Sequence, residues 1–164
     1  MMAENDVRAG KYLTFFLRNE IYGLQILKVQ EIIGLMEITR VPRTPNYMRG
    51  VINLRGKVIP VVDLRVKFSM GPQPDTEKNC IIVVQVPREG GASPVIMGIL
   101  VDEVAEVLDI AAAQIEDTPS FGSELNTEFI LGVGKVGQKV VMMLDVDQVL
   151  TANEMRAVSE IGKN

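Results

Sequence analysis

The sequence from Met48 to Leu64 reads MRGVINLRGKVIPVVDL, and it decides the fold. Two apolar runs rich in β-branched residues, 50–54 and 58–62, flank the cationic residues of Arg55-Gly56-Lys57. Glycine adopts the positive φ that a tight reversal requires, so this stretch predicts a β-hairpin with Gly56 in its turn. Charged residues at hairpin tips are commonly just solubilising, and that alternative applies to Arg55.

Length and composition set the class of protein. A chain of 164 residues is long enough for a substantial core, as one domain or as two compact halves. Apolar residues make up 47% of it, yet no uninterrupted apolar run approaches the roughly 20 residues of a membrane span. Residues 1–10 have no apolar segment typical of a signal peptide, and we expect them to be flexible. The sequence predicts a soluble globular protein that is not exported.

Several functional classes are disfavoured. The single Cys80 opens an apolar run, which indicates a buried thiol in a reducing cytoplasm. The absence of histidine excludes Ser-His-Asp and Cys-His catalysis as well as imidazole metal sites. A net charge of −4 and the lack of tryptophan argue against a nucleic-acid surface. We therefore expect no catalytic residues, no cofactor, no metal and no nucleic-acid partner.

Periodicity and turn residues predict the remaining elements. Three further hairpins are expected, at 11–18 with 21–24, at 80–86 with 95–101, and at 129–136 with 140–144. Spacing typical of helices predicts short helices at 26–33, with Gly34 as the C-cap, and at 102–108. Residues 36–41 are expected to form a strand. The last predicted features are short helical turns capped by Asn46 and Asp63, and a closing helix at about 152–161 that begins with a capping box.

The two halves of the chain resemble one another. Residues 22–33 match 97–108 at an offset of 75, and the central hairpin matches 131–146 at an offset of 82. These offsets indicate a duplicated β-rich module with a loop at 69–79 between the copies, the alternative being chance similarity between amphipathic strands. The glycines at 132, 134 and 137 spell a phosphate-loop pattern, but a strand follows them, so we interpret them as part of a hairpin. The identical pairs across the two halves of the hairpin match are Gly50/Gly132, Val51/Val133, Lys57/Lys139, Val58/Val140 and Asp63/Asp145.

The central hairpin, together with Tyr22-Gly23 and Val29-Gln30-Glu31-Ile32 before it, strongly resembles the CheW family of chemotaxis coupling proteins. The resemblance covers about residues 11 to 160. It implies a mainly β fold of two five-stranded SH3-like β-barrel subdomains with short helices and a C-terminal helix. The implied boundaries are about 11–70 for the first subdomain, about 80–150 for the second, and about 152–161 for the helix, all within one CheW-like domain at 11–164.

The resemblance also implies a function. The protein would be a non-catalytic adaptor that joins the cytoplasmic tips of methyl-accepting chemotaxis receptors to the regulatory domain of the histidine kinase CheA. It would be cytoplasmic and recruited to membrane-associated receptor arrays without inserting into the membrane. The implied receptor-binding residues are Val29, Glu31, Ile32 and Arg55. The implied kinase-binding residues are Met36, Ile38, Val41 and Phe121.

Each of these residues has a packing alternative, which is strongest for Ile32 and Val41. Charged side chains rarely fill a core, which favours Glu31 and Arg55 as functional residues. Two other classes of function remain as alternatives. A β-barrel nucleic-acid binder would hold oligonucleotides in a salt-dependent complex, and a small-molecule or enzymatic role would require a preorganised polar pocket.

Overall fold

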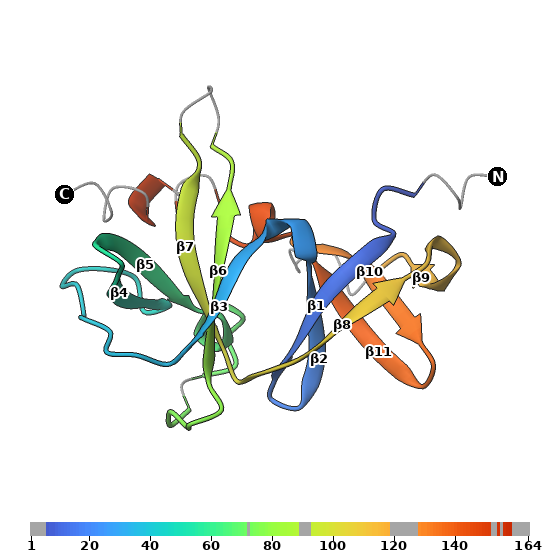
Figure 1. Ribbon diagram of the computed structural model, residues 1–164, viewed down its shortest axis with the longest axis horizontal. Helices are drawn as coiled ribbons and strands as arrows, with labels where there is room; N and C mark the ends of the chain where they lie inside the picture. The colour runs from blue at the N-terminus through green and yellow to red at the C-terminus, as the bar shows by residue number, and fades with distance from the viewer. Residues whose placement is uncertain are drawn as a thin grey trace.

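The structure, a computed structural model, describes residues 6–71, 73–88, 93–118, 128–151, 154 and 156–158. Within these residues the fold is mainly β, and the strands form two sheets (Figure 1). The strands are β1 (Gly10–Leu17), β2 (Glu20–Gln25), β3 (Val29–Gly34), β4 (Met48–Leu54), β5 (Lys57–Asp63), β6 (Cys80–Val86), β7 (Val95–Val101), β8 (Glu103–Ile110), β9 (Ile115–Glu116), β10 (Ile130–Val136) and β11 (Lys139–Leu144). The short helices are η2 (Ile26–Lys28), α1 (Leu64–Lys67), η4 (Ala112–Gln114) and η5 (Val146–Gln148).

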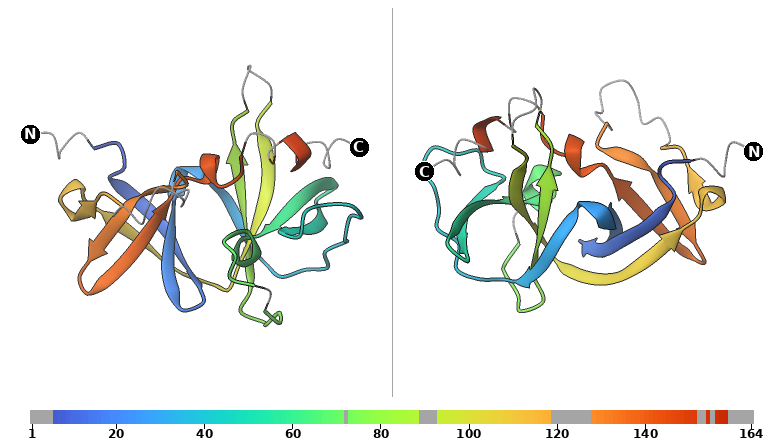
Figure 2. Two further views of the ribbon diagram at one scale, coloured as in Figure 1. Left: turned by 180° about the vertical axis from the view of Figure 1, so that it is seen from behind. Right: turned by 45° about the horizontal axis from the view of Figure 1, so that its top comes forward.

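The two sheets exchange strands between the halves of the chain. The six-stranded sheet has the order β8-β1-β2-β11-β10-β9, and the five-stranded sheet has the order β3-β6-β7-β5-β4. Figures 1 and 2 show the blue β1–β2 hairpin on the same side of the molecule as the orange strands β10 and β11, and the β6–β7 hairpin beside β4 and β5. Each sheet therefore contains strands from both of the ranges 11–70 and 80–150, because β3 pairs with β6 and β8 pairs with β1 across the two halves of the chain.

The register of the strands repeats between the halves and supports a duplicated module. In the central hairpin the pairing slips by one residue between Met48 and Gly50. The β10–β11 hairpin slips at the equivalent place, between Ile130 and Gly132, which is 82 residues later. The parallel contacts also correspond, since β5 lies beside β7 as β11 lies beside β2. Amphipathic patterning alone does not place a bulge, so register slips at equivalent positions favour a repeated module over chance similarity.

Two predicted helices are strands. Residues 26–33 form the single turn η2 followed by β3, and residues 102–108 lie mostly in β8. In β3 half-buried and exposed residues alternate, which is the period of a strand. The sequence alone does not distinguish a helix from a strand here, because the spacing of Val29, Ile32 and Ile33 fits the periods of both. β3 forms as a strand because it pairs with β6, and β8 because it pairs with β1. Both partners are distant in the sequence.

The segment predicted as a strand at 36–41 is mostly irregular. It touches β4 through a single bridge, in which Thr39 and Val51 exchange backbone hydrogen bonds of 2.9 and 2.8 Å. Asn46 does not cap a helical turn. It lies in a turn in which the Met48 N–H donates to the Pro45 carbonyl at 3.0 Å. The two prolines of this region cannot donate to a ladder, which leaves the segment without regular pairing.

The other predicted elements are confirmed within the described residues. All four hairpins form, and the Asp63 carboxylate caps α1 by accepting from the N–H groups of Arg65 at 3.1 Å and Val66 at 3.4 Å. Thr151 and Glu154 form the predicted capping box, with bonds of 2.8 and 3.1 Å, and residues 154 and 156–158 are helical. The remaining residues of the predicted closing helix lie outside the described part of the chain.

The main core joins the two sheets. One buried cluster contains Phe15, Leu24 and Leu144 of the six-stranded sheet together with Val62 and Ile99 of the five-stranded sheet. Full burial of such a side chain stabilises the fold by about 1.5–3 kcal/mol. Because one core serves both sheets, the strands that carry surface residues are held in fixed positions. No helix in the described part of the chain is long and apolar enough to cross a membrane.

Candidate partner-binding surface

The hairpin turn of β4 and β5 presents Arg55 beside the edge strand β3. Asn53 Oδ1 accepts from the Gly56 N–H at 2.9 Å, which fixes the turn, and Gly56 has the positive φ that the sequence predicts. The Arg55 guanidinium donates to the Glu31 carboxylate, and this hydrogen bond raises the pKa of Arg55. The Arg55 side chain is 67% exposed. Since solvent weakens exposed ion pairs, this pair orients two charges more than it stabilises the fold.

The four predicted receptor-binding residues are not all on one face. Glu31 and Arg55 meet, as the sequence allowed. Val29 is half-buried against the main core, whereas Ile32 is 42% exposed. Successive side chains of a strand point to opposite faces, so Ile32 points away from Glu31. Val58, the second residue of β5, is 48% exposed and was not among the predicted residues.

The predicted kinase-binding residues lie in the irregular segment that precedes the central hairpin. Met36 is 37% exposed. Ile38 packs against a core cluster of the five-stranded sheet, and Val41 is half-buried with its carbonyl accepting from Thr44 Oγ1 at 2.8 Å. Met36 is therefore the most accessible of the three. Phe121 lies outside the described residues.

A second surface of the same design lies on the six-stranded sheet. Glu106 of the edge strand β8 pairs with Lys139, with Lys139 Nζ 2.6 Å from Glu106 Oε2. Val107 is 48% exposed and Val140 is 54% exposed. Glu106 and Val107 are equivalent to Glu31 and Ile32 at the offset of 75, and Val140 is equivalent to Val58 at the offset of 82. Sequence reasoning missed this surface, although the repeat was the signal that locates it.

Among the described residues, no group of three or more His, Cys, Asp or Glu side chains is placed to hold a metal ion. The charged residues of both surfaces are instead joined in pairs of opposite sign that connect an edge strand to a hairpin turn. Such surfaces offer apolar contact area beside fixed charges, which is what a docking partner uses.

The comparisons with known proteins agree with one another. Residues 11–154 match the family profile described as a CheW-like domain. A chemotaxis protein CheW of Klebsiella aerogenes is 38% identical over 154 residues, which cover 94% of this chain and 89% of that protein. A chemotaxis protein CheW of Helicobacter pylori is 31% identical over 147 residues, which cover 90% of this chain and 85% of that protein.

A solved structure is also similar. The scaffolding protein TtCheW from Thermoanaerobacter tengcongensis superposes with a TM-score of 0.76 at 34% sequence identity, covering 89% of this chain and 95% of that chain. Its likeness extends over both sheets and is consistent with two SH3-like barrels built from exchanged strands. The family match and these identities over nearly the whole length show that the chain belongs to the CheW family.

Proposed function

We propose that the protein is a non-catalytic adaptor that couples the cytoplasmic tips of chemoreceptors to the histidine kinase CheA. The observation that carries the proposal is the membership of residues 11–154 in the CheW family, whose relatives are named chemotaxis proteins. The arrangement of the two surfaces supports it, since each combines apolar side chains with a fixed ion pair and neither gathers a set of catalytic groups. The adaptor would act in the cytoplasm at membrane-associated receptor arrays.

In this proposal the receptor contacts the turn of the central hairpin and the edge strand β3. Arg55 and Glu31 supply charges that are already oriented, and Val29 and Ile32 supply apolar contact at either face of the strand. A helical receptor tip offers matching rows of apolar and charged side chains. The kinase contacts the segment that contains Met36, Ile38 and Val41, with Phe121 as a further proposed contact.

The receptor site is tested by Arg55→Glu, which places two carboxylates beside each other at the turn. We expect receptor binding to weaken at least tenfold, because like charges replace an oriented pair, while the fold persists since Arg55 is mostly exposed. Titration with receptor cytoplasmic fragments measures the affinity, and circular dichroism checks the fold. Lys11→Glu, also an exposed cation paired with an acid, is the control. Unchanged affinity of the Arg55 variant removes the site.

The kinase site is tested by Met36→Asp, which places a charge in an apolar contact. We expect binding to the regulatory domain of CheA to weaken by about tenfold, since burying an unpaired charge is costly. Isothermal titration measures it, and Val7→Asp, at a residue that is 89% exposed, is the control. If neither CheA nor receptor fragments bind the unmodified protein, the adaptor function itself is wrong.

A further inference from the structure

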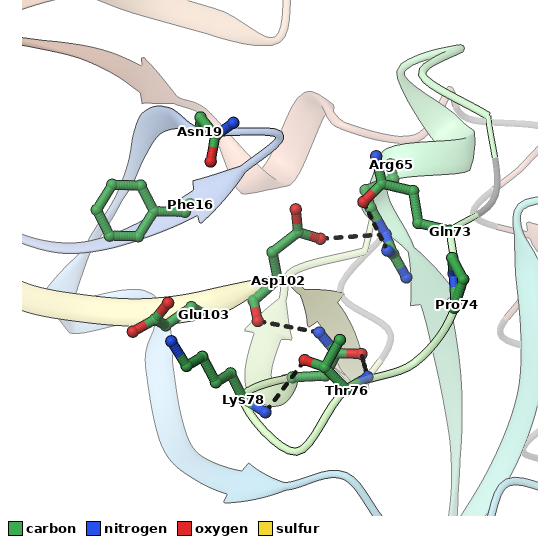
Figure 3. A pocket seen from close by; sticks show the side chains of 10 residues that line it. Phe16, Asn19, Arg65, Gln73, Pro74, Thr76, Lys78, Asp102 and Glu103 are labelled. Atoms are coloured by element: carbon green, nitrogen blue, oxygen red, sulfur yellow. Dashed lines mark hydrogen bonds and ion pairs between the residues drawn. The ribbon is translucent and has the colours of Figure 1, made fainter.

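A cavity of about 290 Å³ lies where the two sheets meet (Figure 3). Asn19 of the β1–β2 turn and Arg65 of α1 line it from two sides. Gln73 and Lys78, from the loop before β6, line a third side, and Asp102 and Glu103 line it at the junction of β7 and β8. None of these residues belongs to the proposed receptor-binding or kinase-binding sites, or to the surface around Glu106 and Lys139.

Arg65 is buried at this cavity with hydrogen-bonding capacity to spare. Its side chain is 1% exposed, and its Nε lies 3.2 Å from Asp102 Oδ1 and 3.6 Å from Asp63 Oδ1. Its Nη2 donates no hydrogen bond to any described residue. A guanidinium carries five N–H donors, and a buried donor without a partner costs about 1–3 kcal/mol. The fold therefore keeps a cation here whose donors are incompletely used.

Gln73 covers the outer end of this guanidinium. Its Oε1 accepts from Arg65 Nη1 at 3.4 Å, which is long for such a bond. The Gln73 residue itself is exposed and lies on a loop, so its amide can leave without disturbing the core. A carboxylate in place of this amide oxygen would form shorter, charge-assisted bonds, and its two oxygens suit the fork of an arginine. A carboxylate that replaced the Gln73 amide would therefore bind the Arg65 guanidinium more strongly than the amide does.

The charges that line the cavity favour a ligand that carries both signs. Arg65 and Lys78 are cationic, and Asp102 and Glu103 are anionic. A simple anion would meet two carboxylates as well as two cations and gain little net attraction. A zwitterion can direct its carboxylate to Arg65 and its ammonium to the acids. The volume lies near the lower end of small-molecule sites, which limits the ligand to a few heavy atoms beyond these two groups.

We propose that this cavity binds a small zwitterion of the free α-amino acid class, with its α-carboxylate on Arg65 in place of the Gln73 amide and its ammonium facing Asp102 and Glu103. The ligand contacts elements of both sheets. The proposal does not depend on the adaptor function, because no residue of the proposed receptor-binding or kinase-binding sites lines the cavity.

The test uses the full chain and three probes of similar size: L-alanine, propionate and ethylammonium. We expect L-alanine to bind in isothermal titration and to raise Tm, and we expect each of the other two to bind at least tenfold more weakly, because each carries only one of the two charges. Propionate binding as tight as that of L-alanine would overturn the zwitterion assignment. Absence of L-alanine binding to both the unmodified protein and Gln73→Ala would overturn the site.

Two variants at Gln73 test whether the ligand binds at Arg65, and they leave the buried arginine itself unchanged. Gln73→Ala uncovers the guanidinium, so we expect L-alanine to bind about threefold more tightly. Gln73→Glu supplies an internal carboxylate, so we expect a higher Tm without ligand and at least tenfold weaker binding. Gln85→Ala, at an exposed glutamine of β6, is the control and should leave binding unchanged. Binding that is equal in all three variants would show that L-alanine binds elsewhere, against the proposal.

Discussion

At the scale of single residues, Gly50 determines how closely the preceding segment approaches β4. Its φ is +145°, and a Cβ at this position would overlap the carbonyl oxygen of Thr39 and lie 2.9 Å from Ile38 Cγ2. Gly132, its equivalent in the second half, faces the carbonyl of Glu116 in the same way, at 2.9 Å. Both glycines allow a backbone to lie directly against the bulge of a hairpin.

We expect Gly50→Ala to destabilise the protein by about 2–3 kcal/mol, because the new methyl group meets backbone that cannot give way. Gly10→Ala is a matched control, since Gly10 has the same φ of +145° but nothing within 4 Å of a Cβ. Denaturant unfolding of both variants separates steric overlap from conformational strain. Equal losses in the two variants would show that the contact with Thr39 is unimportant.

The ionisation of Glu154 makes the stability of the fold depend on pH. Burial opposes its ionisation, but the Thr151 N–H and the Lys67 ammonium outweigh burial and lower its pKa below the ordinary value of 4.5. Its contribution to stability is therefore complete above pH 4.5 and is lost as the pH falls through the lower pKa of the folded state. Burial raises the pKa of Asp145, so that group acts in the opposite sense and favours the folded state at lower pH.

We expect Glu154→Gln to lower the free energy of unfolding by about 1 kcal/mol at neutral pH, with the difference from the unmodified protein shrinking in acid. Urea unfolding at several pH values measures it. Glu77→Gln, at an exposed loop residue, is the control. A loss in the Glu154 variant that stays constant across the pH range would contradict the assignment to its carboxylate.

At the scale of elements, two aspartates equivalent at the offset of 82 begin helical turns with different strength. Asp63 is 4% exposed, accepts two backbone N–H groups and lies beside Arg49 and Arg65. Asp145 accepts a single N–H, that of Asp147, at 3.1 Å. The Asp63 carboxylate also compensates the charges of Arg49 and Arg65, and Arg65 is buried.

We expect Asp63→Ala to cost about 3 kcal/mol, because it removes a cap and leaves the buried Arg65 with one fewer acid. Asp145→Ala, the matched control, should cost about 1 kcal/mol, since only a cap is lost. Thermal unfolding compares the two. Equal losses at Asp63 and Asp145 would show that the buried cation contributes nothing beyond the cap.

The sequence predicted elements well where their pairing is local and less well where it is not. Hairpins, the Gly56 turn and the Asp63 cap depend on neighbouring residues, and the structure confirms them. Strands β3 and β8 depend on partners about 50 and 90 residues away, and their short apolar patterns fit a helix equally well. In the candidate site the Glu31–Arg55 pair was predictable, whereas the matching Glu106–Lys139 pair required the repeat to be followed into the second half.

At the scale of the whole molecule, neither half of the chain contains a complete sheet. The first half supplies β1 and β2 to one sheet and β3, β4 and β5 to the other. The second half completes both, through β6 and β7 in the five-stranded sheet and β8, β9, β10 and β11 in the six-stranded sheet. Folding therefore requires contacts between residues far apart in the sequence, which slows it relative to local topologies.

We expect fragments 1–73 and 74–164 to be unfolded when separate and to refold as a one-to-one complex when mixed. Each fragment alone leaves strand edges and core residues without partners. Circular dichroism and analytical ultracentrifugation of each fragment and of the mixture measure this. Native-like folding of either fragment alone would show that a half is an autonomous domain. The unbroken chain, treated identically, is the control.

The strand exchange has a consequence for how such a molecule is assembled from one repeated unit. Two separate copies of the unit would complete each other's sheets only by associating, so the stability of the folded state would fall on dilution. Fusion into one polypeptide makes that intertwined pairing independent of concentration. It also allows the two copies to diverge, so that the first has Arg55 at its hairpin tip where the second has Gly137, while both keep the lysine two residues later, Lys57 and Lys139.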